Sequence, residues 1–236
     1  MASFIIVKTS KRSIDDKQVK RKIEQLTIYN DSSELRKGIK PETFVSYDDC
    51  VFFEFGFEYN WEYPTVEGTS YAKAYHPVKI LFIAENFIAI EGISEDELSI
   101  VKRFLEDNFV PEIALEPIPF DDKVLRTVID NARDVFEIEH APQRKGMETI
   151  DRLKYAGRGG VTHSTIHEEY GDEPIARTKV DLREVAGETR VTFNQKGTVT
   201  IVQRSEAREI IPVLKVVVER IIKPYAVQAT LQRRLY

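Results

Sequence analysis

The sequence predicts an α+β fold made of two pseudo-symmetric repeats, each with the order strand, helix, four antiparallel strands, helix. One observation is a match between residues 82–95 and 193–206, at a constant offset of 111, in which Phe, Ile and Ser-Glu recur in register. Another is the strict alternation of apolar and polar residues over 51–62, which is typical of a half-buried strand. Both observations are consistent with an antiparallel curved sheet backed by helices.

Two further matches lie upstream. Asp-Asp-Lys occurs at 15–17 and 121–123, and Arg-Lys-Gly occurs at 36–38 and 144–146. Collinear matches with a slowly drifting offset indicate an old duplication. We therefore expect a first repeat at 1–109 and a second repeat at 110–236. No Gly/Ser linker separates them, so we expect one continuous globular unit.

The first repeat opens with a short apolar strand, and Asp15 or Asp16 can cap a helix that runs to Leu26. A polar connector follows at 29–42. Ser94 is a natural N-cap for the closing helix, with acidic residues in its first turn. The predicted strands are 4–7, 51–62, 71–83 and 87–91.

In the second repeat, Asp121 can cap a helix whose apolar stripe extends to Ala132. A polar connector is expected at 140–152. Ser205 is the predicted N-cap of a closing apolar helix that stops before Pro224. The predicted strands are 112–118, 161–170, 175–183, 189–195 and 198–203.

Composition excludes several classes of protein. No apolar run approaches the roughly 18 residues that a membrane span needs. The apolar N-terminal stretch is too short for a secretory signal, and a single cysteine, Cys50, excludes an internal disulfide, so an intracellular (cytoplasmic) location is expected. The net charge of −5 argues against a wholly basic nucleic-acid binder. Residues 1–109 carry 14 Lys and Arg against 19 Asp and Glu, whereas residues 110–236 carry 20 of each.

The element order resembles that of the TATA-binding protein family. The strand–turn–strand–helix block of that family resembles residues 80–92 and 191–201 here. In the family, a Phe before the turn wedges into the DNA minor groove. Phe82 and Phe193 occupy the matching positions, so the resemblance implies a wedge role for them. At the family's second wedge position this chain has Thr65 in the first repeat and Ala176 in the second, and neither side chain can act as a wedge.

Two charged strand faces are candidate binding surfaces. Glu54, Glu58 and Glu62 share one face of the 51–62 strand, and carboxylates repel phosphates, so this face predicts a protein partner. In the second repeat, Arg177, Lys179 and Arg183 share a strand face that could track phosphates. The structural alternative for both is a solvated strand face.

The loop Gly157–Gly160 contains Arg158, a candidate anion contact. Its spacing matches neither the P-loop nor the dinucleotide fingerprint, so a plain glycine turn is the alternative. His163 and His167 fall on one face of the predicted 161–170 strand. A metal site needs three or four convergent ligands, and no further ligand is evident in the sequence, so no metal is expected.

These observations favour a non-catalytic binding protein that grips an elongated partner on its sheet face, without a cofactor. Nucleic acid would be held by the second repeat through Arg158, Arg177, Lys179, Arg183 and Phe193, with Phe82 as the first-repeat wedge. The alternative is a protein-interaction or assembly module that uses Glu54, Glu58 and Glu62, with a protein partner or another copy of the chain and no nucleic acid. The two hypotheses differ in the expected salt dependence of binding.

Overall fold

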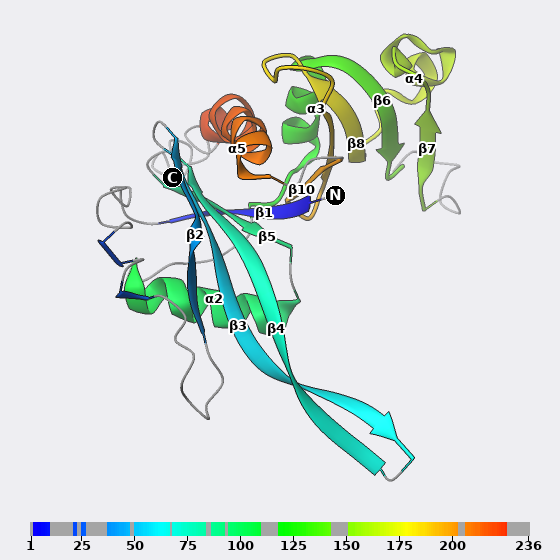
Figure 1. Ribbon diagram of the computed structural model, residues 1–236. Helices are drawn as coiled ribbons and strands as arrows, with labels where there is room; N and C mark the ends of the chain where they lie inside the picture. Colours follow the sequence, from blue (N-terminus) through cyan, green and yellow to red (C-terminus); the bar gives the residue numbers. More distant parts are fainter. Residues whose placement is uncertain are drawn as a thin grey trace, which may run out of the picture. The chain divides into compact units, whose positions relative to one another are not determined.

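The computed structural model describes residues 2–9, 21–22, 25–26, 37–47, 50–66, 68–83, 86–92, 94–109, 118–142, 151–202 and 206–225. The fold class is α+β, with antiparallel strands and helices (Figure 1). The chain forms two compact units: unit 1 comprises Met1–Val7 and Glu116–Tyr236, and unit 2 comprises Lys8–Leu115. These units differ from the predicted halves because residues 2–5 pair with residues 198–201. Unit 2 is thus inserted, in sequence, between the first strand and the rest of unit 1.

Unit 2 contains a sheet with the strand order β2-β3-β4-β5. Its elements are β2 (Lys37–Tyr47), β3 (Cys50–Thr65), β4 (Gly68–Ile83), β5 (Phe87–Glu91) and α2 (Glu95–Asn108). The predicted cap of α2 is confirmed: the Ser94 hydroxyl accepts a hydrogen bond from the Glu97 N–H, and the Glu97 carboxylate accepts one from the Ser94 N–H. The helix packs on the aromatic side of β3, where Phe104 stacks on Phe55 with ring centroids 4.0 Å apart.

Unit 1 contains a sheet with the order β1-β10-β9-β8-β6-β7, and all its strand pairs are antiparallel. Asp121 caps its first helix as predicted, by accepting a hydrogen bond from the Val124 N–H at 2.9 Å. The elements are β1 (Ala2–Lys8), α3 (Asp122–Asp130), β6 (Ala132–His140), β7 (Leu153–Ala156), the 3-10 turn η1 (Val161–His163), α4 (Thr165–Tyr170), β8 (Ile175–Leu182), β9 (Arg190–Asn194), β10 (Thr198–Ile201), α5 (Ala207–Val216) and its π-helical continuation η2 (Val217–Ile222).

The hairpins β4–β5 and β9–β10 pair in the same register when compared at the offset of 111. Phe82 lies opposite Ile88, and Phe193 lies opposite Val199. A helix follows each hairpin, α2 in unit 2 and α5 in unit 1. The two segments that match in sequence therefore have the same local structure.

Several predicted elements are wrong. The predicted strand 161–170 is η1 followed by α4, because the Ser164 hydroxyl accepts a hydrogen bond from the His167 N–H and starts a helix there. Ala132 opens β6 instead of ending the preceding helix, and β2 begins inside the predicted connector 29–42. The predicted strand 112–118, most of the predicted helix ending at Leu26, and the predicted cap Ser205 lie outside the described residues; Glu206 is the N-cap of α5.

Candidate functional site

The β3–β4 ribbon of unit 2 extends past both neighbouring strands, as Figure 1 shows. β3 and β4 stay paired along their whole length. The pairing of β2 with β3 ends at Phe57, and the pairing of β5 with β4 covers only Ile80–Ile83. Residues 58–65 and 68–75 therefore form a two-stranded ribbon whose outer edges face no other strand within the described chain. We call this ribbon the arm.

The three predicted carboxylates do share one face of β3, but their exposure differs. The Glu54 side chain is 17% exposed, and its Oε1 lies 2.6 Å from Lys40 Nζ on β2. Glu58 is 9% exposed. Glu62, further along the arm, is exposed. Of the three, Glu62 is thus the carboxylate that an incoming partner can reach most readily.

Tyrosines lie across the ribbon from these carboxylates. Tyr75 is opposite Glu58 and Tyr71 is opposite Glu62. The Tyr75 ring covers Gly56, where a Cβ atom would lie 1.8 Å from its hydroxyl, and Lys40 Nζ lies 4.9 Å from the centre of the same ring. The hydrogen bond to Glu54 raises the pKa of Lys40, and burial raises the pKa of Tyr75.

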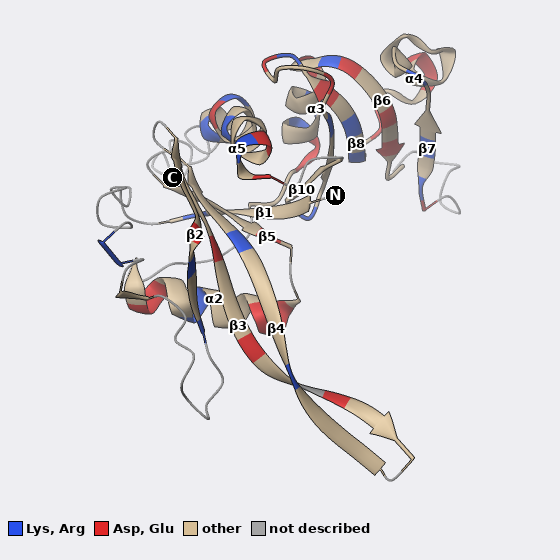
Figure 2. Cartoon of the chain, in the orientation of Figure 1, with Lys and Arg blue, Asp and Glu red and all other residues tan. Residues whose placement is uncertain are grey.

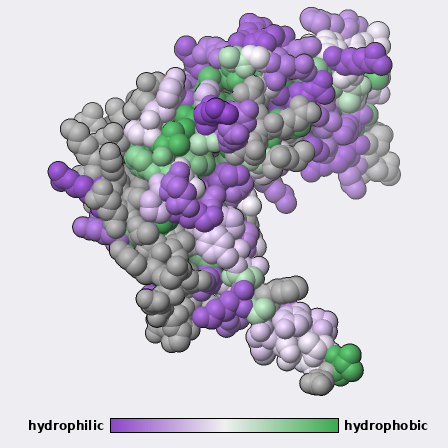
Figure 3. Space-filling view, viewed as in Figure 1, coloured by the Kyte–Doolittle hydropathy of each residue, from purple (hydrophilic) through white to green (hydrophobic). Residues whose placement is uncertain are grey.

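The end of the arm is apolar and exposed. Tyr71 is 63% exposed, and Val66, in the turn between β3 and β4, is fully exposed. Figure 3 shows a pale, weakly polar surface along the arm with a hydrophobic patch at its end. On the other face of the ribbon Tyr59, next to the core residue Phe57, is 37% exposed. The arm therefore presents several exposed tyrosine side chains.

The predicted basic stripe of unit 1 is interleaved with carboxylates from β6. Arg177 lies opposite Glu139, and Lys179 lies opposite Glu137. Glu137 is 3.8 Å from Arg177 Nε and 3.0 Å from Lys154 Nζ, so part of the positive charge is neutralised (Figure 2). The sequence could not show this, because β6 lies about forty residues upstream, between the predicted helix that reaches Ala132 and the connector predicted from residue 140, where no strand was predicted.

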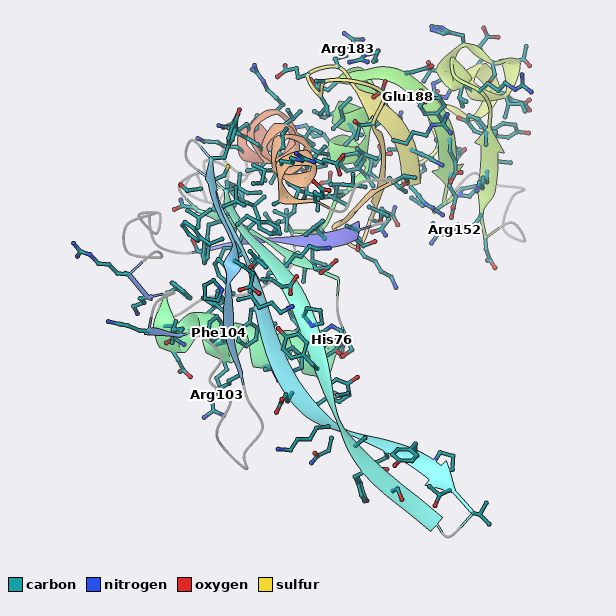
Figure 4. All side chains as sticks on the ribbon, viewed as in Figure 1. His76, Arg103, Phe104, Arg152, Arg183 and Glu188 are labelled. Carbon is teal, nitrogen blue, oxygen red and sulfur yellow. The ribbon has the colours of Figure 1, made fainter. Side chains whose placement is uncertain are left out.

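Arg183 and Arg158 lie apart from that stripe. Arg183 follows the last residue of β8 (Figure 4), and its Nε donates a hydrogen bond to the Ala132 carbonyl at 2.7 Å. Arg158 is exposed in the loop after β7. The glycine loop binds an anion of its own chain: the Gly160 N–H donates to the Asp134 carboxylate at 2.7 Å. The structure therefore favours the plain-turn interpretation of Gly157–Gly160.

Phe82 and Phe193 are core residues. Phe82 is 6% exposed and packs against Phe53 and Phe109, at centroid distances of 5.7 and 5.8 Å. Phe193 is fully buried against Phe120. A wedge must present its ring to solvent before it enters a base step. The wedge role that the resemblance implied is therefore wrong for both rings.

Unit 1 also contains a hydrogen-bonded chain of three side chains that sequence reasoning missed. His140 Nδ1 lies 2.8 Å from the Glu173 carbonyl oxygen and must donate to it, so the neutral imidazole accepts at Nε2. The Tyr155 hydroxyl, 2.8 Å away, donates to that Nε2 and accepts from His167 Nδ1 at 2.7 Å. The hydrogen-bond directions thus follow from a single carbonyl.

Burial shifts the pKa of all three groups. It lowers the pKa of His140 and of His167, and it raises the pKa of Tyr155 to about 12. Protonating His140 at Nε2 would reverse the chain, because Nε2–H would then donate to the Tyr155 hydroxyl and that hydroxyl to His167 Nδ1. The lowered pKa of His140 favours the neutral form. The prediction that His163 and His167 lie on one face of a strand is wrong, since the two residues lie on η1 and α4. No group of three metal-ligating side chains occurs among the described residues.

Within the described ranges, no helix is both long and apolar enough to cross a membrane. No known family model matches the sequence, and no curated protein is significantly similar to it.

Proposed function

We propose that this protein is a non-catalytic binding protein and that the arm of unit 2 is its protein-binding element. One observation carries the proposal: β3 and β4 stay paired beyond the described residues of both flanking strands, so that several exposed tyrosines lie on one projecting ribbon. An isolated two-stranded ribbon is marginally stable in water. Exposed strand edges readily accept a further strand, and tyrosine is enriched in protein interfaces.

A peptide-display selection tests this function. A library of extended peptides is selected on the full chain and on a variant in which residues 59–74 are replaced by a two-residue Asn-Gly turn joining Glu58 to Tyr75, which already face each other. We expect peptides that bind the wild type and not the shortened variant. Circular dichroism checks that the variant is folded. If every selected peptide binds both proteins equally, or no peptide is selected, the arm is not a protein-binding element.

Nucleic-acid binding by unit 1 is the second candidate. It is favoured by the polar rows across its sheet, in which Lys179 lies beside Thr192 and Thr200, and Arg177 lies beside Asn194. Lys179 forms no ion pair within the described part of the chain. The candidate ranks second because Glu137 and Glu139 lie beside these cations; Arg158 and Arg183 would contribute from the loops.

Salt dependence tests the second candidate. A fluorescent duplex and a single-stranded oligonucleotide are titrated at low and moderate salt with wild type and with Arg177→Glu/Lys179→Glu. Loss of two phosphate contacts should lower the slope of log affinity against log salt by about 2. The control is Arg103→Glu/Arg208→Glu, the same charge change on exposed helix positions. No binding at low salt would exclude this candidate.

We also propose that the fold is a duplicated, TATA-binding-protein-like arrangement. The shared register of the β4–β5 and β9–β10 hairpins supports it, as does the helix that follows each. An experimental structure in which the two halves do not superpose over these elements would contradict it.

A further inference from the structure

The hydrogen-bonded chain of His140, Tyr155 and His167 joins α4 to the sheet of unit 1. α4 is six residues long, none of them is buried, and it follows β7 and η1 along the chain (Figure 1). His167 Nδ1 lies 2.7 Å from the hydroxyl of Tyr155, which belongs to β7. Because α4 contributes no side chain to the core, its attachment to the sheet depends on polar contacts of this kind, and it is a candidate for local opening.

The chain accommodates one added proton. With His140 neutral, the Tyr155 hydroxyl donates to His140 Nε2 and accepts from His167 Nδ1, and this holds whether His167 is neutral or charged. If the proton is on His140 instead, both hydrogen bonds reverse, and a neutral His167 accepts at Nδ1. In each of these states the hydroxyl donates one hydrogen bond and accepts one.

A second proton does not fit. His140 Nδ1 donates to the Glu173 carbonyl in either charge state, so a charged His140 must also donate from Nε2 to the Tyr155 oxygen. A charged His167 donates to the same oxygen from Nδ1. With both imidazoles charged, the hydroxyl hydrogen has no acceptor within the chain, and two positive charges share one hydroxyl group. Burial lowers the pKa of both imidazoles and so also disfavours the second proton.

Charged groups from the neighbouring elements surround the two histidines. Arg126 on α3 donates to the carbonyls of residues 171–173, and after burial its positive charge is a further cause of both lowered pKa values. Asp122 acts in the opposite direction on His140, and Asp172 does so on His167, but Asp122 is already paired with Arg126 at 2.7 Å. Because the pKa of both histidines stays lowered, these carboxylates do not offset burial and Arg126. The other titratable groups of these elements are His163 on η1, the exposed Glu168 and Glu169 on α4, and the buried Glu173.

We propose that this chain is an acid-sensitive latch: α4 is attached to β7 while the chain holds at most one added proton, and it is released when both His140 and His167 are charged. In the released form, the charged His167 returns to water and the Tyr155 hydroxyl can donate to water. Because the released form binds more protons than the attached form, release is favoured as pH falls below about 6.5. The Tyr155 ring, 8% exposed with α4 in place, then becomes accessible.

Hydrogen exchange of the full chain, followed by NMR at about pH 7.5 and about pH 5, tests the latch. The informative amides are those of Glu168 and Gly171, which donate to the carbonyls of Ser164 and His167. Their protection factors, corrected for the intrinsic effect of pH on exchange, should fall at least about fivefold at the lower pH, the effect of losing one hydrogen bond. His167→Asn places an uncharged amide donor near the position of Nδ1, so its protection should be equal at both pH values. His163→Asn, the same change at an exposed histidine of η1, should behave as the wild type does.

The ring signals of the four histidines report protonation in the same wild-type samples. Loss of α4 protection over the pH range in which both His140 and His167 become charged supports the latch. If the wild type keeps its α4 protection at about pH 5, or if both imidazoles are charged while α4 is still protected, the latch is wrong. It is also wrong if His167→Asn loses protection as the wild type does, or if the amides of β6 and β8 lose protection by the same factor, since the acid effect would then be a general loss of stability. If His167→Asn already lacks α4 protection at neutral pH, the wild-type titration alone decides.

Discussion

Replacing Tyr155 with phenylalanine removes one oxygen atom and keeps the ring, so it isolates the two hydrogen bonds of that hydroxyl. His140 is fully buried, and its Nε2 would remain buried without a donor, at a cost of about 1–3 kcal/mol. His167 is partly exposed, so its Nδ1–H can return to water, and its lost bond costs about 0.5–1.5 kcal/mol. We expect Tyr155→Phe to lower the free energy of unfolding by about 1.5–4.5 kcal/mol, the sum of these two costs.

Urea unfolding near neutral pH, followed by far-UV circular dichroism, measures this loss. Tryptophan fluorescence is unsuitable, because the single tryptophan of the chain, Trp61, belongs to unit 2. Hydrogen exchange of the β7 and α4 amides locates the effect. The control is Tyr71→Phe, an exposed tyrosine that should change stability by less than about 0.5 kcal/mol. If Tyr155→Phe costs no more than Tyr71→Phe, the hydrogen-bonded chain does not stabilise unit 1 as argued.

Three further predictions follow from other features. Because the pKa of His140 is lowered in the folded state, the unfolded chain binds more protons, and the free energy of unfolding should fall as pH drops below about 6.5. His140→Gln should make this dependence of the free energy of unfolding on pH shallower, as measured by urea unfolding at several pH values. An equal dependence in the variant would contradict the prediction. Gly56→Ala should displace the Tyr75 ring and cost about 1 kcal/mol, largely the cation–π contact, as measured by urea unfolding; a loss above about 3 kcal/mol would mean that the ring cannot move. Gly159→Ala should cost about 1–3 kcal/mol, because its φ is +135° and a Cβ atom would lie 2.1 Å from the Asp134 carboxylate; a neutral result in thermal unfolding would show that the loop rearranges freely.

Local signals in the sequence predict the elements of this protein better than they predict its surfaces. The strand β3 and the caps at Ser94 and Asp121 depend on neighbours a few residues away, and the structure confirms them. A strand was predicted where α4 lies, because the spacing of the two histidines fits strand alternation. The N-cap residue Ser164, followed by acidic residues, was the signal for a helix.

The sequence could not predict how much of the positive charge of Arg177 and Lys179 is neutralised, because this depends on the pairing of strands that are far apart in the sequence. Arg177 and Lys179 do share a strand face, but the carboxylates that neutralise Arg177 come from β6, whose pairing no local pattern reveals. The hydrogen-bonded chain joins His140, Tyr155 and His167 from three elements, and its register depends on how β7 and α4 fold back. Such sites depend on tertiary pairing, which a single sequence does not display.

The pairing of β1 with β10 has a consequence for how the chain is made. Ala2 lies opposite Ile201, so β1 cannot pair with β10 until the chain has been synthesised as far as Ile201. The contacts of unit 2, by contrast, lie within Lys8–Leu115 and are complete much earlier. Long-range pairing is slow because a large loop must close first, and domains generally fold as units during synthesis. Unit 2, with its arm, is therefore expected to be folded before the pairing of β1 with β10 completes the sheet of unit 1.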